Sequence, residues 1–295
     1  MTQQTTGLAW RRSLVVARAL GSLLLGGVAV LGAVFVFRQG LLPLIDAVWR
    51  PGPEWLSAFR RAGILLSAMA SYWAYVHWHE RRNVTELRLQ PLRLLLGGAS
   101  GAILVALPMA ALFALGAYKL VHFRGVSPTL LGIAALLLIA ATLEELIYRC
   151  LLFRVLEGAL GTWVALAVQA VLFALAHLEN LEHGGGGEAA TMLVSVSVLG
   201  LLWGALFALT RNLWVAVANH AAWNFTILLS GVPLSGNEDW RALAPLNSCY
   251  AGPDWLTGGR FGPENSLLVM ASALVAVLLL LRALRRHGAV LKPKT

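Results

Sequence analysis

Eight runs of mostly apolar residues dominate this sequence, and most have the length of about 17–25 residues that a helix needs to cross a bilayer, with two on the short side. Backbone groups in lipid must bond to one another, so such a chain folds as membrane helices. The mean hydropathy of +0.73 and the charged fraction of 13% agree, because soluble domains carry about twice that charge. We predict an all-α polytopic membrane protein with about eight transmembrane helices, forming one integral-membrane domain over residues 1–295. The expected spans are Leu14–Phe37, Ala62–Trp78, Leu94–Leu120, Leu130–Tyr148, Trp163–Leu178, Met192–Thr210, Leu213–Leu229 and Leu267–Leu284.

The distribution of basic residues predicts the topology. With eight spans, both termini lie on one side of the membrane. That side holds 15 of the 23 Lys and Arg residues, and the opposite loops hold 8. Basic residues are enriched in cytoplasmic segments, so we expect a multi-pass protein of the cell membrane with both termini cytoplasmic. Because the basic residues are scattered, the sequence predicts contact with membrane lipid and no nucleic-acid partner.

Two glutamates and an arginine stand inside the fourth run, in the sequence ATLEELIYR. Ionisable residues are costly at membrane depth and mark functional sites by default. Positions four apart share a helix face, so Glu145 and Arg149 are expected to form an ion pair, whereas Glu144 points about 100° away. Without a local cation, Glu144 suits a general base that takes a proton from water. The alternative is a purely structural charge cluster of all three residues.

A histidine closes the fifth run, in the sequence FALAH, where Phe173 lies one turn before His177 on the same face. The midpoint between Glu144 and His177 falls at Leu160-Gly161, inside a glycine-rich turn. An antiparallel hairpin about this turn places both side chains at equal depth, about 16 residues or roughly 25 Å from it. Charged residues near the turn favour a hairpin that protrudes into water: Arg149, Arg154 and Glu157.

The seventh run contains NHAAWN, in which His220 and Asn224 are four residues apart and share one helix face. Polar side chains of membrane helices also serve as interhelical hydrogen-bonding groups, which is the alternative interpretation of this pair. Asn219 is a candidate for that structural role.

The order Glu-Glu-x-x-x-Arg, Phe-x-x-x-His and His-x-x-x-Asn, each in a separate apolar segment, resembles the CPBP family. This family comprises the CAAX prenyl endopeptidases and the bacteriocin-processing enzymes, also called Abi intramembrane proteases. The resemblance covers residues 130–229, which would be the motif-bearing catalytic core. The stretch from Gly252 to Glu264 also resembles a loop of bacterial members.

The resemblance implies a role for each matching residue. Glu144 would activate water, and His177 would position that water or carry its proton. His220 and Asn224 would donate hydrogen bonds to the oxyanion that forms when water attacks a peptide carbonyl. Supporting roles in orientation and helix pairing would fall to the remaining motif residues: Glu145, Arg149 and Phe173.

The family is also described as metalloproteases, and Glu144, His177 and His220 are the alternative ligands for zinc. The local HExxH pattern is absent. If Glu144 binds the metal, the remaining base is Glu145, which is already paired with Arg149. We therefore expect a metal-free, glutamate-dependent hydrolysis without a cofactor, with zinc as the alternative.

The predicted function is that of an intramembrane endopeptidase that cleaves a hydrophobic or lipid-anchored peptide. One alternative is a proton-coupled transporter, although transporters often show repeated halves that this sequence lacks. The other is a non-catalytic family member that binds a membrane partner.

Overall fold

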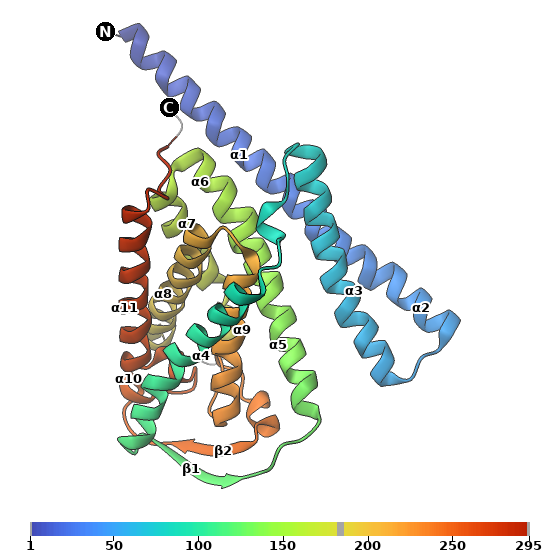
Figure 1. Ribbon diagram of the computed structural model, residues 1–295, viewed down its shortest axis with the longest axis vertical. Coiled ribbons are helices and arrows are strands. Elements are labelled where there is room, and N and C mark those ends of the chain that lie inside the picture. The colour runs from blue at the N-terminus through green and yellow to red at the C-terminus, as the bar shows by residue number, and fades with distance from the viewer. Residues whose placement is uncertain (1, 182–185, 294–295) are drawn as a thin grey trace.

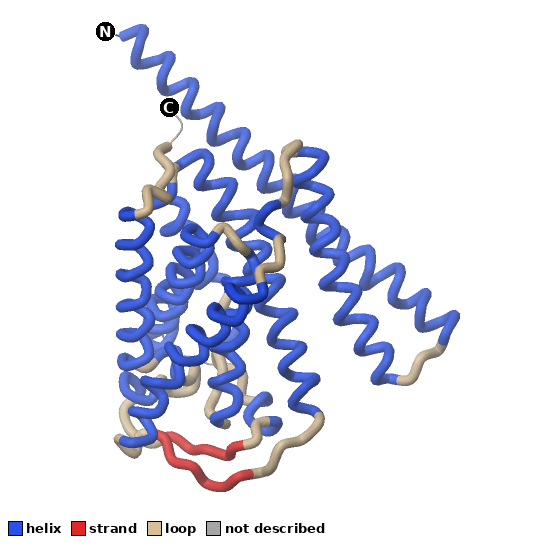
Figure 2. Tube along the Cα trace, viewed as in Figure 1, coloured by secondary structure: helices blue, strands red, loops and turns tan. Residues whose placement is uncertain are grey.

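The computed structural model describes residues 2–181 and 186–293, and helices form almost all of it (Figures 1 and 2). The first half contains α1 (Thr2–Val36), the π-helix η1 (Phe37–Leu41), α2 (Leu42–Trp49), α3 (Pro53–Ala74), η2 (Tyr75–His79), η3 (Thr85–Leu87), α4 (Pro91–Ala114), β1 (Tyr118–Phe123), α5 (Thr129–Glu145) and η4 (Leu146–Phe153). The second half contains α6 (Arg154–Leu160), α7 (Thr162–Ala176), η5 (Leu178–Leu181), α8 (Gly186–Thr210), α9 (Leu213–Ser230), η6 (Asp239–Leu243), β2 (Leu246–Tyr250), α10 (Asp254–Thr257), η7 (Pro263–Asn265) and α11 (Leu267–Arg286).

The predicted polytopic helical fold is confirmed, and each of the eight predicted spans lies mostly on a helix. Six helical stretches of the described chain are long and apolar enough to cross a membrane: Ser13–Trp49, Pro91–Ala114, Thr129–Leu160, Thr162–Asn180, Gly186–Thr210 and Leu267–Arg286. The other two predicted spans lie on α3 and α9. Helix α3 carries Glu54, Arg60 and Arg61, and the 18 residues of α9 include the polar NHAAWN motif. Polar residues thus lower the hydropathy of both helices.

The helices form a bundle with one arm that leans away from it. Helices α4, α7, α8, α9 and α11 pack together with α5 beside them, while α2 and most of α3 project outward (Figure 1). The amino end of α1 and the carboxyl end of α11 lie toward the same end of the bundle as the α6–α7 turn (Figure 1). The two strands close the opposite end (Figure 2).

The third predicted span was too long. Helix α4 ends at Ala114, and Gly116 turns the chain with a φ of +74°, in the left-handed region that favours glycine. The following apolar segment forms β1, which pairs antiparallel with β2, with Tyr118 opposite Tyr250. Alternation of residues in YKLVHF suits a strand as well as a membrane helix, so hydropathy alone misassigned it. The long connection between α9 and α11 is therefore held by a sheet.

The predicted hairpin about Leu160-Gly161 is present. A helical stretch from α5 through η4 ends with α6 at Leu160, and Gly161 reverses the chain with a φ of +81° before α7 begins. The expectation that charged residues here face water was wrong. Arg149 and Glu157 are buried, and Glu157 accepts hydrogen bonds from Thr162 and from Arg211 at the start of the α8–α9 turn. Arg154 donates a hydrogen bond to Glu80. These charged side chains are therefore stabilised by ion pairs within the protein rather than by contact with water.

Close backbone contact positions α9 against α4. A Cβ added at Gly101 would lie 2.1 Å from the carbonyl oxygen of Asn219, and one at Gly97 would lie 2.8 Å from that of Val215. Small residues permit such approach between membrane helices. Because α9 also carries His220, the packing of α4 fixes the position of that imidazole.

We predict that Gly101→Ala destabilises the protein by about 1–3 kcal/mol, because the added methyl group overpacks a backbone contact. Unfolding in detergent measures the change. The matched control is Gly98→Ala, in which the nearest atom to the new methyl group is 3.7 Å away. Equal stability of the two variants would contradict the close packing of α4 and α9.

Candidate active site

Glu144 and Glu145 lie at the carboxyl end of α5 and point in different directions. Glu145 forms an ion pair with Arg149, with 3.1 Å between Oε2 and Nε, and both side chains are fully buried. The side chain of Glu144 is 35% exposed. The adjacent glutamates therefore have different environments, one enclosed with a cation and one in contact with solvent space.

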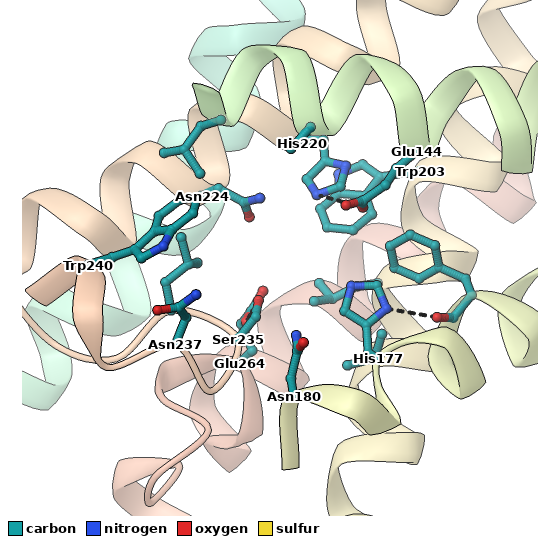
Figure 3. Close-up of a pocket in the computed structure, with 16 residues that line it drawn as sticks. Glu144, His177, Asn180, Trp203, His220, Asn224, Ser235, Asn237, Trp240 and Glu264 are labelled. Atoms are coloured by element: carbon teal, nitrogen blue, oxygen red, sulfur yellow. Dashed lines mark hydrogen bonds and ion pairs between the residues drawn. The ribbon is translucent and has the colours of Figure 1, made fainter. Parts of the chain in front are cut away.

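One imidazole bridges the two glutamates. His220 on α9 places Nδ1 3.0 Å from Oε1 of Glu145. Its Nε2 lies 3.8 Å from Oε2 of Glu144 (Figure 3). Its ring stacks on Trp203 of α8, with centroids 3.6 Å apart and planes inclined by 15°. The carboxylate of Glu145 and the indole of Trp203 thus fix both the position and the plane of the His220 ring.

His177 lies at the carboxyl end of α7 and is the site residue from the second arm of the hairpin. Its Nδ1 lies 2.8 Å from the carbonyl oxygen of Phe173, which only accepts hydrogen bonds, so Nδ1 carries a proton. The other ring nitrogen is on the cavity side (Figure 3). The Phe173 ring packs between His177 and Arg149, with centroid distances of 4.6 Å to the imidazole and 4.6 Å to the guanidinium carbon. Phe173 therefore connects the buried ion pair to the cavity wall.

The two asparagines of NHAAWN have different surroundings. Asn219 accepts a hydrogen bond from Trp203 and donates two to α4, at the carbonyl of Gly97 and the hydroxyl of Ser100. Asn224 faces the cavity instead (Figure 3). Its Oδ1 is buried and has no hydrogen-bond partner among the described residues. An unpaired buried amide oxygen is available to a water or to a bound peptide N–H.

A cavity of about 210 Å³ brings all four predicted catalytic residues to one space. Apolar side chains from α5, α7 and α8 line part of it, and the connection between α9 and α11 closes another side. The lining residues are Leu137, Ala140, Glu144, Phe173, His177, Asn180, Val196, Leu199, Trp203, His220, Asn224, Leu234, Ser235, Asn237, Trp240 and Glu264.

The sequence analysis assigned no site role to Glu264, Trp203 or Asn180. Glu264 belongs to a glycine- and proline-rich connection, a composition that indicates a loop rather than a site. The only available signal was the resemblance of the Gly252–Glu264 stretch to a loop of bacterial CPBP members. Trp203 sits in an apolar helix, where an aromatic residue ordinarily belongs to the core.

The three alternative zinc ligands named above, Glu144, His177 and His220, all line this cavity. Catalytic zinc takes three protein ligands within about 2.0–2.2 Å. Glu144 and His220 approach each other, but the described chain contains no group of three His, Cys, Asp or Glu side chains arranged to hold one metal ion. Nδ1 of His220 faces Glu145, and Nδ1 of His177 faces a carbonyl. Metal-binding histidines have the same kind of partners on their other ring nitrogen, so zinc stays the alternative.

These features define a polytopic membrane protein with an internal acid–histidine site. Residues 126–226 match the family model described as type II CAAX prenyl endopeptidase Rce1-like. This part of the chain is similar to the CPBP/CAAX proteases, and the match indicates a protease. The matched segment runs from just before α5 to within α9 and so contains all three motifs. No curated protein matches the chain.

We predict that Arg149→Met destabilises the protein by about 3–5 kcal/mol, because it leaves the buried carboxylate of Glu145 without its cation. The double variant Glu145→Gln/Arg149→Met removes both charges and is expected to regain part of that loss. Unfolding in mixed micelles measures each variant, with exposed Arg60→Met as the control. A double variant no more stable than Arg149→Met alone would contradict this pairing.

Proposed function

We propose that the protein is an intramembrane endopeptidase that hydrolyses a peptide bond in a hydrophobic or lipid-anchored substrate. The observation that carries this proposal is the approach of the Glu144 carboxylate and the His220 imidazole, 3.8 Å apart, at one cavity inside the helix bundle. A partly exposed carboxylate beside an oriented imidazole is a suitable arrangement for activating water. The family match supports the same class of reaction.

Glu144 is the proposed general base. Its 35% exposed side chain has access to water in the cavity, whereas Glu145 is enclosed and committed to Arg149 and His220. Glu144 takes a proton from water while the water oxygen attacks the carbonyl carbon of the substrate. The cavity-side nitrogen of His177 accepts a hydrogen bond from that water and holds it in place.

Asn224 and His220 are the proposed oxyanion donors. The amide of Asn224 supplies an N–H group, and its unpaired Oδ1 accepts from a substrate backbone N–H. With Glu145 ionised in its pair with Arg149, the proton on Nδ1 of His220 faces that carboxylate. Donation to an oxyanion therefore requires a second proton on Nε2, so His220 acts as an imidazolium. An imidazolium also balances the charges of the two glutamates and Arg149.

The substrate class follows from the walls of the cavity and from the family. Leu137, Val196 and Leu199 give the cavity an apolar side that suits a hydrophobic peptide. The family is named for endopeptidases that act on prenylated CAAX sequences, so a peptide carrying a prenyl group is the first substrate to test. We place the protein in the cell membrane with both termini cytoplasmic, because 15 of 23 basic residues lie on the terminal side.

We predict that Glu144→Gln lowers the rate of peptide cleavage by about 10²–10⁴-fold, because glutamine cannot take a proton from water. Purified protein in detergent is incubated with a farnesylated CAAX peptide and its unprenylated equivalent, and the products are identified by mass spectrometry. Glu54→Gln, at an exposed position of α3, is the matched control. Undiminished turnover by a folded Glu144→Gln variant would remove Glu144 from the mechanism.

We predict that removal of metal leaves peptide cleavage unchanged, because the carboxylate of Glu144 can take a proton from water without the help of a Lewis acid. The measurement is the cleavage rate after dialysis against a chelator, with metal analysis of the same preparation. A loss of activity that added zinc restores would replace the glutamate mechanism with a metal-dependent one.

A further inference from the structure

Glu264 lies in the same cavity as Glu144 but comes from a different part of the chain. It belongs to the short helix η7 that precedes α11, and only 4% of it is exposed. The preceding Gly262 has a φ of +98°, and a Cβ there would lie 2.1 Å from the carbonyl oxygen of Pro233. This contact between two loop segments requires glycine and holds the Glu264 side chain against the cavity (Figure 3).

Glu264 differs from the other buried glutamates by having no arginine partner. Glu86 pairs with Arg82, Glu145 with Arg149 and Glu157 with Arg211, whereas no ion pair forms on Glu264 within the described residues. These pairs are the usual solution for an ionised carboxylate out of contact with water. Glu264 instead receives a hydrogen bond from a neutral group, the hydroxyl of Ser235, at 2.5 Å.

The surroundings of Glu264 therefore favour its protonated form. Burial raises the pKa of Glu264, and the hydrogen bond from Ser235 together with the charge of His220 opposes part of this rise. The titratable groups that share its cavity are Glu144 of α5, His177 of α7 and His220 of α9. A carboxylic acid that keeps its proton near neutral pH can donate that proton to a substrate.

Peptide hydrolysis requires such a donor. After water has added to the carbonyl carbon, the C–N bond breaks only if the departing nitrogen gains a proton, because an amide anion is a very poor leaving group. Resting on the proposed function, we propose that Glu264 is the general acid that protonates the leaving amine. The electron pair of the breaking C–N bond goes to nitrogen, which bonds to the proton of Glu264. The proton that Glu144 took from water then returns to Glu264 through water in the cavity.

The contrast between Glu144 and Glu264 matches the division of work in acid–base catalysis. Glu144 is 35% exposed beside His220, which suits an ionised base, and Glu264 is enclosed beside a hydroxyl, which suits a neutral acid. Enzymes assign acid and base roles to two carboxyl groups through such unequal environments. The two groups come from α5 and η7, and so lie on different walls of the cavity (Figure 3).

The test compares an amide substrate with its ester analogue. The peptide that the wild-type protein cleaves is made a second time with the scissile amide replaced by an ester, whose alkoxide leaving group needs much less help from an acid. We expect Glu264→Gln to lower amide cleavage by about 10²–10⁴-fold and to lower ester cleavage far less. Glu144→Gln is expected to lower both, because both need activated water. Glu238→Gln is the matched control, since its side chain is 47% exposed in the same connection.

The conservative variant Glu264→Asp keeps a carboxylic acid but has a shorter side chain, so its rate of amide cleavage is expected to lie between those of Glu264→Gln and the wild type. Equal losses on amide and ester, or no loss on either, would overturn the role of Glu264 as an acid. If Glu264→Gln does not fold, the ratio of amide to ester cleavage rates in Glu264→Asp decides the matter. A ratio equal to that of the wild type would overturn the role of Glu264. If the wild-type protein cleaves neither substrate, the proposed function itself fails. If Glu144→Gln matches the wild type on both, only the role of Glu144 as the base fails, and each result is distinct from failure at Glu264.

Discussion

A guanidinium that has no access to water lies at the centre of this structure. Arg149 is fully buried and reaches Glu145 at 3.1 Å, and the rings of Phe173, Trp203 and Tyr148 surround it within 5.8 Å. A buried cation is costly unless anions and polarisable rings enclose it, so these contacts restrict how the helices can pack. They join η4 to α5, α7 and α8, and the Glu145–His220 contact adds α9. One ion pair thus holds together the helices that form the cavity.

This arrangement also explains why adjacent glutamates have different properties. Consecutive helical residues diverge by about 100°, so commitment of Glu145 to Arg149 turns Glu144 toward the cavity. The same commitment leaves Glu145 with a second oxygen that orients His220. The imidazole then presents its other nitrogen to Glu144. The position of the proposed base therefore depends on a structural pair that does not itself contact the cavity.

The sequence predicted what depends on helical spacing and missed what depends on long-range contacts. The i,i+4 relation of Glu145 and Arg149 and the hairpin about Gly161 follow from helix geometry and glycine conformation alone. The strand β1 exists because β2, more than a hundred residues later, pairs with it. The burial of Glu157 depends on Arg211 of another turn. Glu264 reaches the cavity through a loop whose path no local pattern specifies.

Polar groups that form their hydrogen bonds within the protein have a structural role, whereas a buried polar group without a partner is available to a substrate. In an apolar bundle, side chains such as Asn219 complete their bonds with neighbouring helices. Buried polar atoms without such partners occur on five described residues, and among these only Asn224 lines the cavity. Oδ1 of Asn224 has no hydrogen-bond partner among the described residues, and the carboxyl of Glu264 has no ion-pair partner among them. Both side chains line the same cavity. A peptide group has both an N–H and a carbonyl, so its binding would satisfy the amide while bringing its nitrogen within reach of an acid.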